Sequence, residues 1–206
     1  MQKYLVIGFV IVALACNATN VDGKDCVPPN KANPKECCHF PRPINDENFH
    51  KCVEQFGKQS HRNLEAVQSG GPERGCCVSE CVMNSTGAIV DGHIDAGKMK
   101  SMMKEAAGDA AADWEPVLEK MAEKCLAEAE SKTDEFEKIM SMPPLNPDDR
   151  VCNPKFGFLM GCFMKELYQN CPEKIFQKDK PECVELKAYM ADCPYPKKKL
   201  ELTEEE

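Results

Sequence analysis

The sequence predicts an all-α protein, a compact bundle of about six to eight helices cross-linked by disulfides. Apolar residues recur at spacings of three, four and seven along most of the chain, as in amphipathic helices, and strand-like alternation does not recur. The 206 residues include 14 cysteines. Cys77 and Cys81 share a helical face because they stand four apart, and the step from Cys162 to Cys171 needs about two and a half turns. These spacings indicate helices that are bridged to one another.

Residues 1–18 have the features of a secretory signal peptide. Lys3 precedes an apolar run from Leu5 to Leu14, which is shorter than the about 20 residues that a membrane span needs. Cleavage after Ala18 would leave 13 cysteines, and cleavage after Ala15 would leave all 14; the first is favoured. We therefore expect a secreted, extracellular protein whose cysteines form disulfides, with one cysteine left over if the count is odd.

Charge and motifs exclude several classes of function. The formal net charge is -8, and it becomes -9 when Lys3 leaves with the signal peptide, so nucleic acid is not expected as a partner. No Gly-x-Ser-x-Gly, His-Glu-x-x-His or phosphate-binding loop occurs, so we expect no enzyme and no cofactor. Cys37, Cys38 and His39 lack the paired spacing of zinc ligands, and neither double cysteine is followed by the His-Asp pair of secreted phospholipases.

The first half of the mature chain is predicted to contain an arm followed by two helices. Residues 19–48 should form an extended N-terminal arm, because five prolines fall in this stretch. A helical core of residues 49–172 begins with an amphipathic helix through Phe49, Cys52 and Phe56. Residues 57–75 are polar and loop-like, and helix resumes over residues 73–83.

Later elements are placed by their capping residues. Asp95 should cap a methionine-bearing helix, Asp109 or Asp113 should start the next, and Thr133 should cap a short one. Asn153 and Pro154 open a helix that is apolar around much of its circumference, so it should be buried on several sides. Prolines 172 and 181 mark helix starts in a C-terminal helical extension of residues 173–196, and residues 197–206 form a charged tail.

Six cysteines resemble the pattern of insect odorant-binding proteins, with three residues between the second and third and eight between the fifth and sixth. The further cysteines, and a proline directly after the sixth, resemble the Plus-C subgroup of that family. The resemblance covers about residues 25–193. The six are Cys52, Cys77, Cys81, Cys125, Cys162 and Cys171.

The resemblance implies a disulfide pairing of Cys52 with Cys81, Cys77 with Cys162, and Cys125 with Cys171. The sequence does not determine how the additional cysteines pair. In one geometry consistent with their positions, disulfides link both terminal extensions to the central helices. The additional cysteines are Cys26, Cys37, Cys38, Cys76, Cys152, Cys183 and Cys193.

The resemblance also implies a carrier of odorants or pheromones that holds small hydrophobic molecules in an internal apolar cavity. An olfactory receptor at the membrane surface and a homodimer are the further partners to consider. The alternatives are a non-olfactory carrier of lipophiles and a disulfide-rich interaction or inhibitor protein with a solid core. Methionine adapts to ligands of different shape, and the competing interpretation of each candidate is core packing. The candidate ligand-binding residues are Met99, Met102, Met103, Trp114, Leu118, Met121, Phe156, Leu159, Met160, Phe163 and Tyr168.

Two polar features lie outside this candidate site. Asn84, Ser85 and Thr86 form a sequon for N-glycosylation. His93 lies in a glycine-flanked segment and is expected to be a solvated loop residue.

Overall fold

The computed structural model describes residues 29, 32–44, 46–62, 76–90, 92–141 and 150–192. The signal peptide, the charged tail, Cys26 and Cys193 lie outside these residues, as does the side chain of Cys76. The described part of the chain is a disulfide-cross-linked helical bundle, as predicted. None of the helices in these ranges is both long enough and apolar enough to cross a bilayer.

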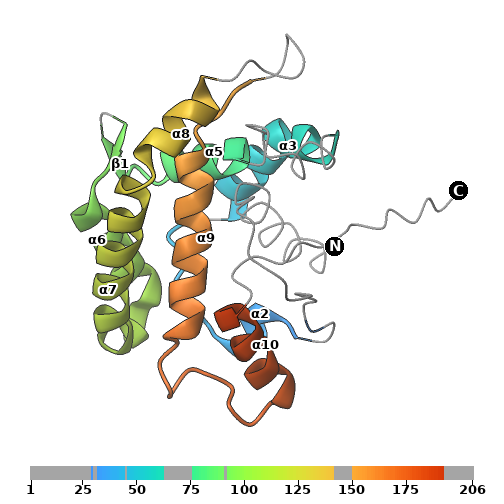
Figure 1. Ribbon diagram of the computed structural model, residues 1–206. Coiled ribbons are helices and arrows are strands. Elements are labelled where there is room, and N and C mark those ends of the chain that lie inside the picture. The colour runs from blue at the N-terminus through green and yellow to red at the C-terminus, as the bar shows by residue number, and fades with distance from the viewer. Residues whose placement is uncertain are drawn as a thin grey trace, which may run out of the picture.

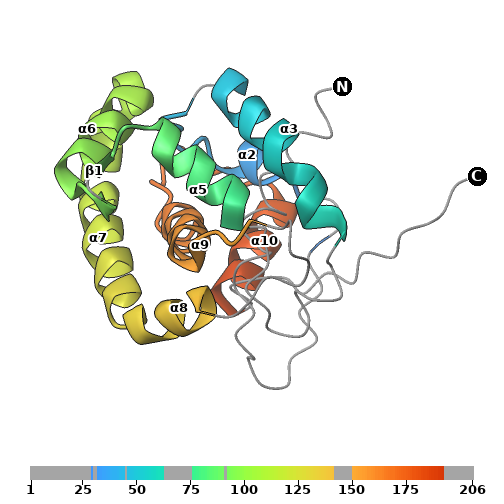
Figure 2. The ribbon, with the colours of Figure 1, turned by 90° about the horizontal axis from the view of Figure 1, so that it is seen from above.

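Helix α9 (Pro154–Gln169) is the central element of the bundle. It begins where predicted, because the Asn153 side chain accepts a hydrogen bond from the Lys155 amide at 2.9 Å and Pro154 occupies the first helical turn. Helices α5 (Cys76–Ser85), α7 (Ala111–Glu130), α8 (Thr133–Met140) and α10 (Pro181–Asp192) pack against α9. Figure 2 looks along α9 and shows these helices around it. This surrounding explains why α9 is apolar on most of its circumference.

Helix α6 (Ala96–Ala107) packs against α7, and a 3₁₀ turn (Gly108–Ala110) joins them. Asp95 caps α6 as predicted, since its carboxylate accepts a hydrogen bond from the Lys98 amide at 2.9 Å. Neither Asp109 nor Asp113 caps α7; Ala110 stands at that position without a side-chain hydrogen bond. The 3₁₀ turn continues almost directly into α7, so a side-chain cap has no place to form.

Several predicted boundaries were wrong. Helix α3 (Asp46–Arg62) continues through Gly57, because one glycine costs a helix only about 1 kcal/mol. Thr133 does not cap α8; its hydroxyl donates to the Glu130 carbonyl at 2.8 Å instead. Pro172 starts hydrogen-bonded turns with Ile175 and Phe176 rather than a helix, whereas α10 does begin at Pro181.

Two small elements were not predicted. The N-terminal arm contains a short helix, α2 (Pro34–Cys37), capped by the Asn33 side chain. Strands β1 (Ile89–Val90) and β2 (His93–Ile94) pair in an antiparallel hairpin that places an exposed His93 on β2. Gly92 has a φ of 77° in the turn between them, a conformation that glycine adopts without strain.

Five disulfides join described cysteines, and only one of them is among the three implied by the resemblance. Cys52 is bonded to Cys81, which links α3 to α5. The other two implied pairings, Cys77 with Cys162 and Cys125 with Cys171, are wrong. The remaining bridges are Cys77–Cys152, Cys125–Cys162, Cys38–Cys171 and Cys37–Cys183.

Helix packing explains this correction. Cys162 lies on α9, which packs against α7, and the nearest partner there is Cys125. The first turns of α5 lie beside the segment entering α9, since the Glu80 carboxylate accepts from the Asn153 amide at 2.8 Å. Cys77 on α5 is therefore bonded to Cys152 in that segment. Cys171, just after α9, is bonded to Cys38 of the arm.

Candidate functional site

An apolar pocket lies between the N-terminal arm and helices α5, α6, α7 and α9. The open space that the centre of a water-sized sphere can reach in it is about 70 Å³. A single water needs roughly 10–15 Å³ by this measure, so the pocket exceeds a packing defect but is narrow for a whole organic ligand. A bound molecule would therefore require movement of lining side chains.

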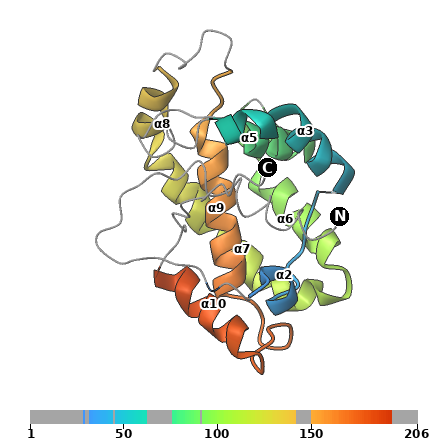
Figure 3. The ribbon, with the colours of Figure 1, turned by 90° about the vertical axis from the view of Figure 1, so that its right-hand side faces the viewer.

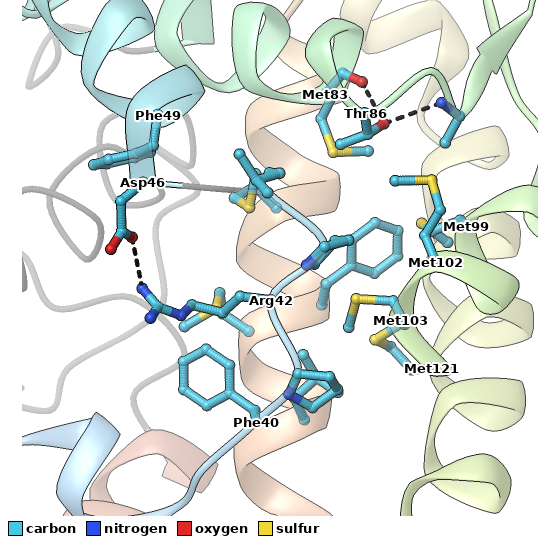
Figure 4. Close-up of a pocket in the computed structure, with 18 of the residues that line it drawn as sticks. Phe40, Arg42, Asp46, Phe49, Met83, Thr86, Met99, Met102, Met103 and Met121 are labelled. Atoms are coloured by element: carbon cyan, nitrogen blue, oxygen red, sulfur yellow. Dashed lines mark hydrogen bonds and ion pairs between the residues drawn. The ribbon is translucent and has the colours of Figure 1, made fainter. Parts of the chain in front are cut away.

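Methionines dominate the lining, and four helices contribute them. Helix α6 supplies Met99, Met102 and Met103, which Figure 4 shows facing the arm beside Met121 of α7. Methionine side chains are unbranched and polarizable, so they change rotamer at small cost and fit ligands of different shape. The methionines that line the pocket are Met83, Met99, Met102, Met103, Met121, Met160 and Met164.

Residues 40–44 of the arm, which we call the strap, form the opposite wall of the pocket. Pro41 and Pro43 restrict its backbone to extended conformations and remove two amide donors that an apolar site could not satisfy. Disulfides anchor the chain on both sides of the strap, Cys38 to Cys171 before it and Cys52 to Cys81 after it. The strap is therefore a fixed part of the pocket rather than a free terminus.

The structure brings together six of the eleven candidate ligand-binding residues. Five of the candidates do not line the pocket, because they face the contacts of α7 and α9 with the rest of the core. The tyrosine among these five is packed edge-on against Phe176, with ring centroids 6.2 Å apart. The candidates that line the pocket are Met99, Met102, Met103, Met121, Met160 and Phe163. The candidates that lie in the core instead are Trp114, Leu118, Phe156, Leu159 and Tyr168.

Sequence reasoning missed the contribution of the arm and of α5. Phe40 and Ile44 are the apolar residues of a proline-rich segment next to a double cysteine, which was the available signal that this segment packs on the body. Met83 and Ala88 near the hairpin, and Met164 and Leu167 on α9, also line the pocket. Their helical spacing alone does not separate pocket lining from ordinary core.

Polar groups are confined to the edge of the pocket. Arg42 of the strap forms an ion pair with Asp46 of α3, with Nη1 and Oδ1 3.3 Å apart, on the side of the strap turned away from the labelled α6 methionines. The Thr86 hydroxyl donates to the Met83 carbonyl at 2.6 Å and accepts from the Ala88 amide at 3.1 Å. Burial, reinforced by Arg42, holds the pKa of Lys35 below its usual value. The site is built to bury apolar surface, and its polar chemistry is limited to these groups.

The described ranges show neither a cluster of metal ligands nor a free thiol. They contain no group of three or more His, Cys, Asp or Glu side chains arranged to hold a metal ion. The ten described cysteines are all bonded in disulfides, so none of them offers a thiolate.

Comparison with known proteins extends these observations. The family model described as AgamOBP47-like matches residues 41–189, from the strap into α10. Odorant-binding protein 47 of Anopheles gambiae is 30% identical over 175 residues, an alignment that covers 84% of this chain and 75% of that protein. Both matches include the helices that surround the methionine pocket.

Proposed function

Because the chain belongs to the AgamOBP47-like family of insect odorant-binding proteins, we propose that it is a secreted carrier of small hydrophobic molecules such as odorants or pheromones. It would bind them in the methionine pocket and transport them through chemosensory fluid without changing them chemically. The observation that supports this proposal is the lining of the pocket, to which four helices contribute seven methionines and the strap contributes the other wall.

The physical basis of binding is burial of apolar ligand surface, worth about 25 cal/mol per Å² removed from water. The disulfides support such a site because they hold the helices in position while the interior between them remains incompletely filled. The narrow open space implies that methionine side chains rotate to admit a ligand. Multiple disulfides also fit an extracellular protein, where thiols are oxidised.

Binding is tested with a fluorescent naphthylamine probe and a matched pair of variants. Met102→Gln keeps the length of a side chain that lines the pocket but introduces an amide without a partner there. We expect this variant to bind the probe about three- to tenfold more weakly, since an unpaired amide costs roughly 1 kcal/mol or more. Met140→Gln is the control, because Met140 is 39% exposed on α8 and does not line the pocket.

Displacement of the probe by medium-chain alcohols, esters or aromatic volatiles would support a carrier. An absence of saturable probe binding in the correctly oxidised protein would favour a disulfide-rich interaction or inhibitor protein with a solid core. Equal weakening by the two glutamine variants would place the binding site elsewhere in the molecule.

A further inference from the structure

Lys35 is a cation at the edge of the pocket that forms no ion pair with another described residue. Its side chain is half-buried and lines the pocket, yet among the described residues no carboxylate lies within 4.0 Å of its Nζ. Asp46, the acidic residue among those lining the pocket, is already paired with Arg42 at 3.3 Å. Among the described lining residues, the pocket edge therefore carries two cations and one anion, which leaves an excess of one positive charge.

From this arrangement we propose, building on the carrier function above, that the preferred ligand is a linear carboxylate amphiphile of the fatty-acid class. Its carboxylate pairs with Lys35 and, beside it, with Arg42. Arg42 and Asp46 lie on one side of the strap and the α6 methionines lie on the other, and all of them line the same pocket. The hydrocarbon chain of the ligand therefore runs along the strap from the charged edge into the space between the methionines.

An anionic headgroup relieves an electrostatic cost that a neutral ligand leaves in place. Burial and the neighbouring Arg42 both disfavour the charged form of Lys35, and Asp46 offsets them only in part. A carboxylate at this position supplies the missing opposite charge and accepts charge-assisted hydrogen bonds. The negative net charge of the whole chain acts against this preference at long range, but salt screens it over about 10 Å while contact pairs persist.

The test compares dodecanoate with 1-dodecanol, which have equal chain length and differ in the headgroup. Each is titrated at neutral pH and an ionic strength of about 0.1 M, below its micelle-forming concentration, by displacement of the naphthylamine probe. We expect the wild-type protein to bind dodecanoate about two- to fivefold more tightly than dodecanol, the range of a partly exposed charge pair. Added salt should reduce this ratio.

Three variants identify the cation responsible. Lys35→Met should bring the ratio of dodecanoate affinity to dodecanol affinity, measured within that variant, close to one, whereas Lys35→Arg should keep the preference for dodecanoate. Lys138→Met is the control, because Lys138 is exposed on α8 and remote from the pocket lining. Saturable binding of the naphthylamine probe and a helical circular dichroism spectrum like that of the wild type show that Lys35→Met is folded.

Two outcomes would overturn the proposal while leaving the carrier function intact. One is equal affinity of the wild-type protein for the two ligands. The other is a preference for dodecanoate that survives in both Lys35→Met and the double variant Lys35→Met/Arg42→Met. Failure of the naphthylamine probe itself to bind would instead overturn the carrier function on which the proposal rests.

Discussion

Glu166 is a charged residue in the middle of the apolar helix α9, with its side chain only 6% exposed. It remains acceptable there because Lys124 of α7 donates to its carboxylate at 2.6 Å and Asn170 donates at 3.2 Å. The hydrogen bond to Glu166 raises the pKa of Lys124 above its usual value. The stabilisation from the lysine is therefore present below its unfolded-state pKa and is lost as pH rises through the folded-state value.

The first prediction concerns this pair. Lys124→Met should lower the free energy of unfolding by about 1–3 kcal/mol, because it leaves a buried carboxylate with one donor fewer. Lys120→Met on the exposed face of the same helix should change it by less than about 0.5 kcal/mol. Urea denaturation of both variants measures the difference. Equal stability of the two would show that Asn170 alone satisfies Glu166.

Two tyrosines with buried hydroxyls, the buried Tyr168 and the half-buried Tyr189, predict how the protein responds to alkali. The hydroxyls of Tyr168 and Tyr189 have no hydrogen-bond partner among the described residues. Burial raises the pKa of Tyr189 to about 12 and also raises the pKa of Tyr168. Unfolded tyrosine ionises near pH 10, so above that pH the unfolded chain binds fewer protons than the native one and stability falls as pH rises toward 12.

We expect two phenols to titrate late when phenolate absorbance is followed in the native protein. In denaturant, all of them should titrate near the ordinary value of about 10. Tyr168→Phe should remove one late step and should not destabilise the fold, since the lost hydroxyl makes no hydrogen bond within the described ranges. A clear loss of stability in Tyr168→Phe would indicate that this hydroxyl has a partner.

Helix α6 is the element that carries three of the pocket methionines, and its first turn depends on one cap. Asp95→Ala should lower the free energy of unfolding by about 0.5–2 kcal/mol, because the Lys98 amide loses its acceptor. Asp109→Ala is the control, since Asp109 is exposed and does not cap α7 in the described structure. Chemical denaturation of the two variants provides the comparison, and equal losses would contradict a specific role for the cap.

Local signals predicted those helix starts where one side chain satisfies an amide, as at Asp95 and Asn153. They failed where packing outweighs propensity. Helix α3 continues through Gly57 although glycine is a poor helix former. The strap was predicted as an extended arm, but its role as a pocket wall follows from tertiary contacts that a proline count does not contain.

The two wrong disulfide pairings follow from assigning the fifth and sixth cysteines of the family pattern to the wrong positions. The structure keeps an interlaced pattern in which the first cysteine pairs with the third, the second with the fifth, and the fourth with the sixth. This holds when Cys152 is the fifth and Cys162 the sixth, so the assignment from spacing was displaced by one cysteine. Spacing could not resolve it, because the steps from Cys152 to Cys162 and from Cys162 to Cys171 are nearly equal in length.

At the scale of the whole molecule, the N-terminal arm and the C-terminal extension are joined to each other. Figures 1 and 3 show α2 and α10 side by side at one end of α9. Cys37 is bonded to Cys183 on α10, and the adjacent Cys38 is bonded to Cys171 at the end of α9. Helix α10 itself packs on α9, where the Gln169 side-chain amide donates to the Lys187 carbonyl at 2.8 Å, and its described residues do not line the pocket. The extension therefore supports the fold and anchors the arm just before the strap.

These two bridges are expected to act cooperatively, since they span 146 and 133 residues but begin and end close together. While either bridge is intact, the other closes an additional loop of only about 13 residues, worth roughly 3 kcal/mol of unfolded-state entropy. Removing both also opens the long loop, which the intact Cys52–Cys81 and Cys77–Cys152 bridges shorten to about 50 residues, worth roughly 4 kcal/mol. The loss of stability in Cys37→Ala/Cys38→Ala/Cys171→Ala/Cys183→Ala should thus exceed the summed losses of the two paired variants by about 1 kcal/mol. Denaturant unfolding of the three proteins tests this, with Cys52→Ala/Cys81→Ala as a control whose loss should add independently to that of either pair. Strict additivity of the two end bridges would mean that some other link still holds the arm to the extension.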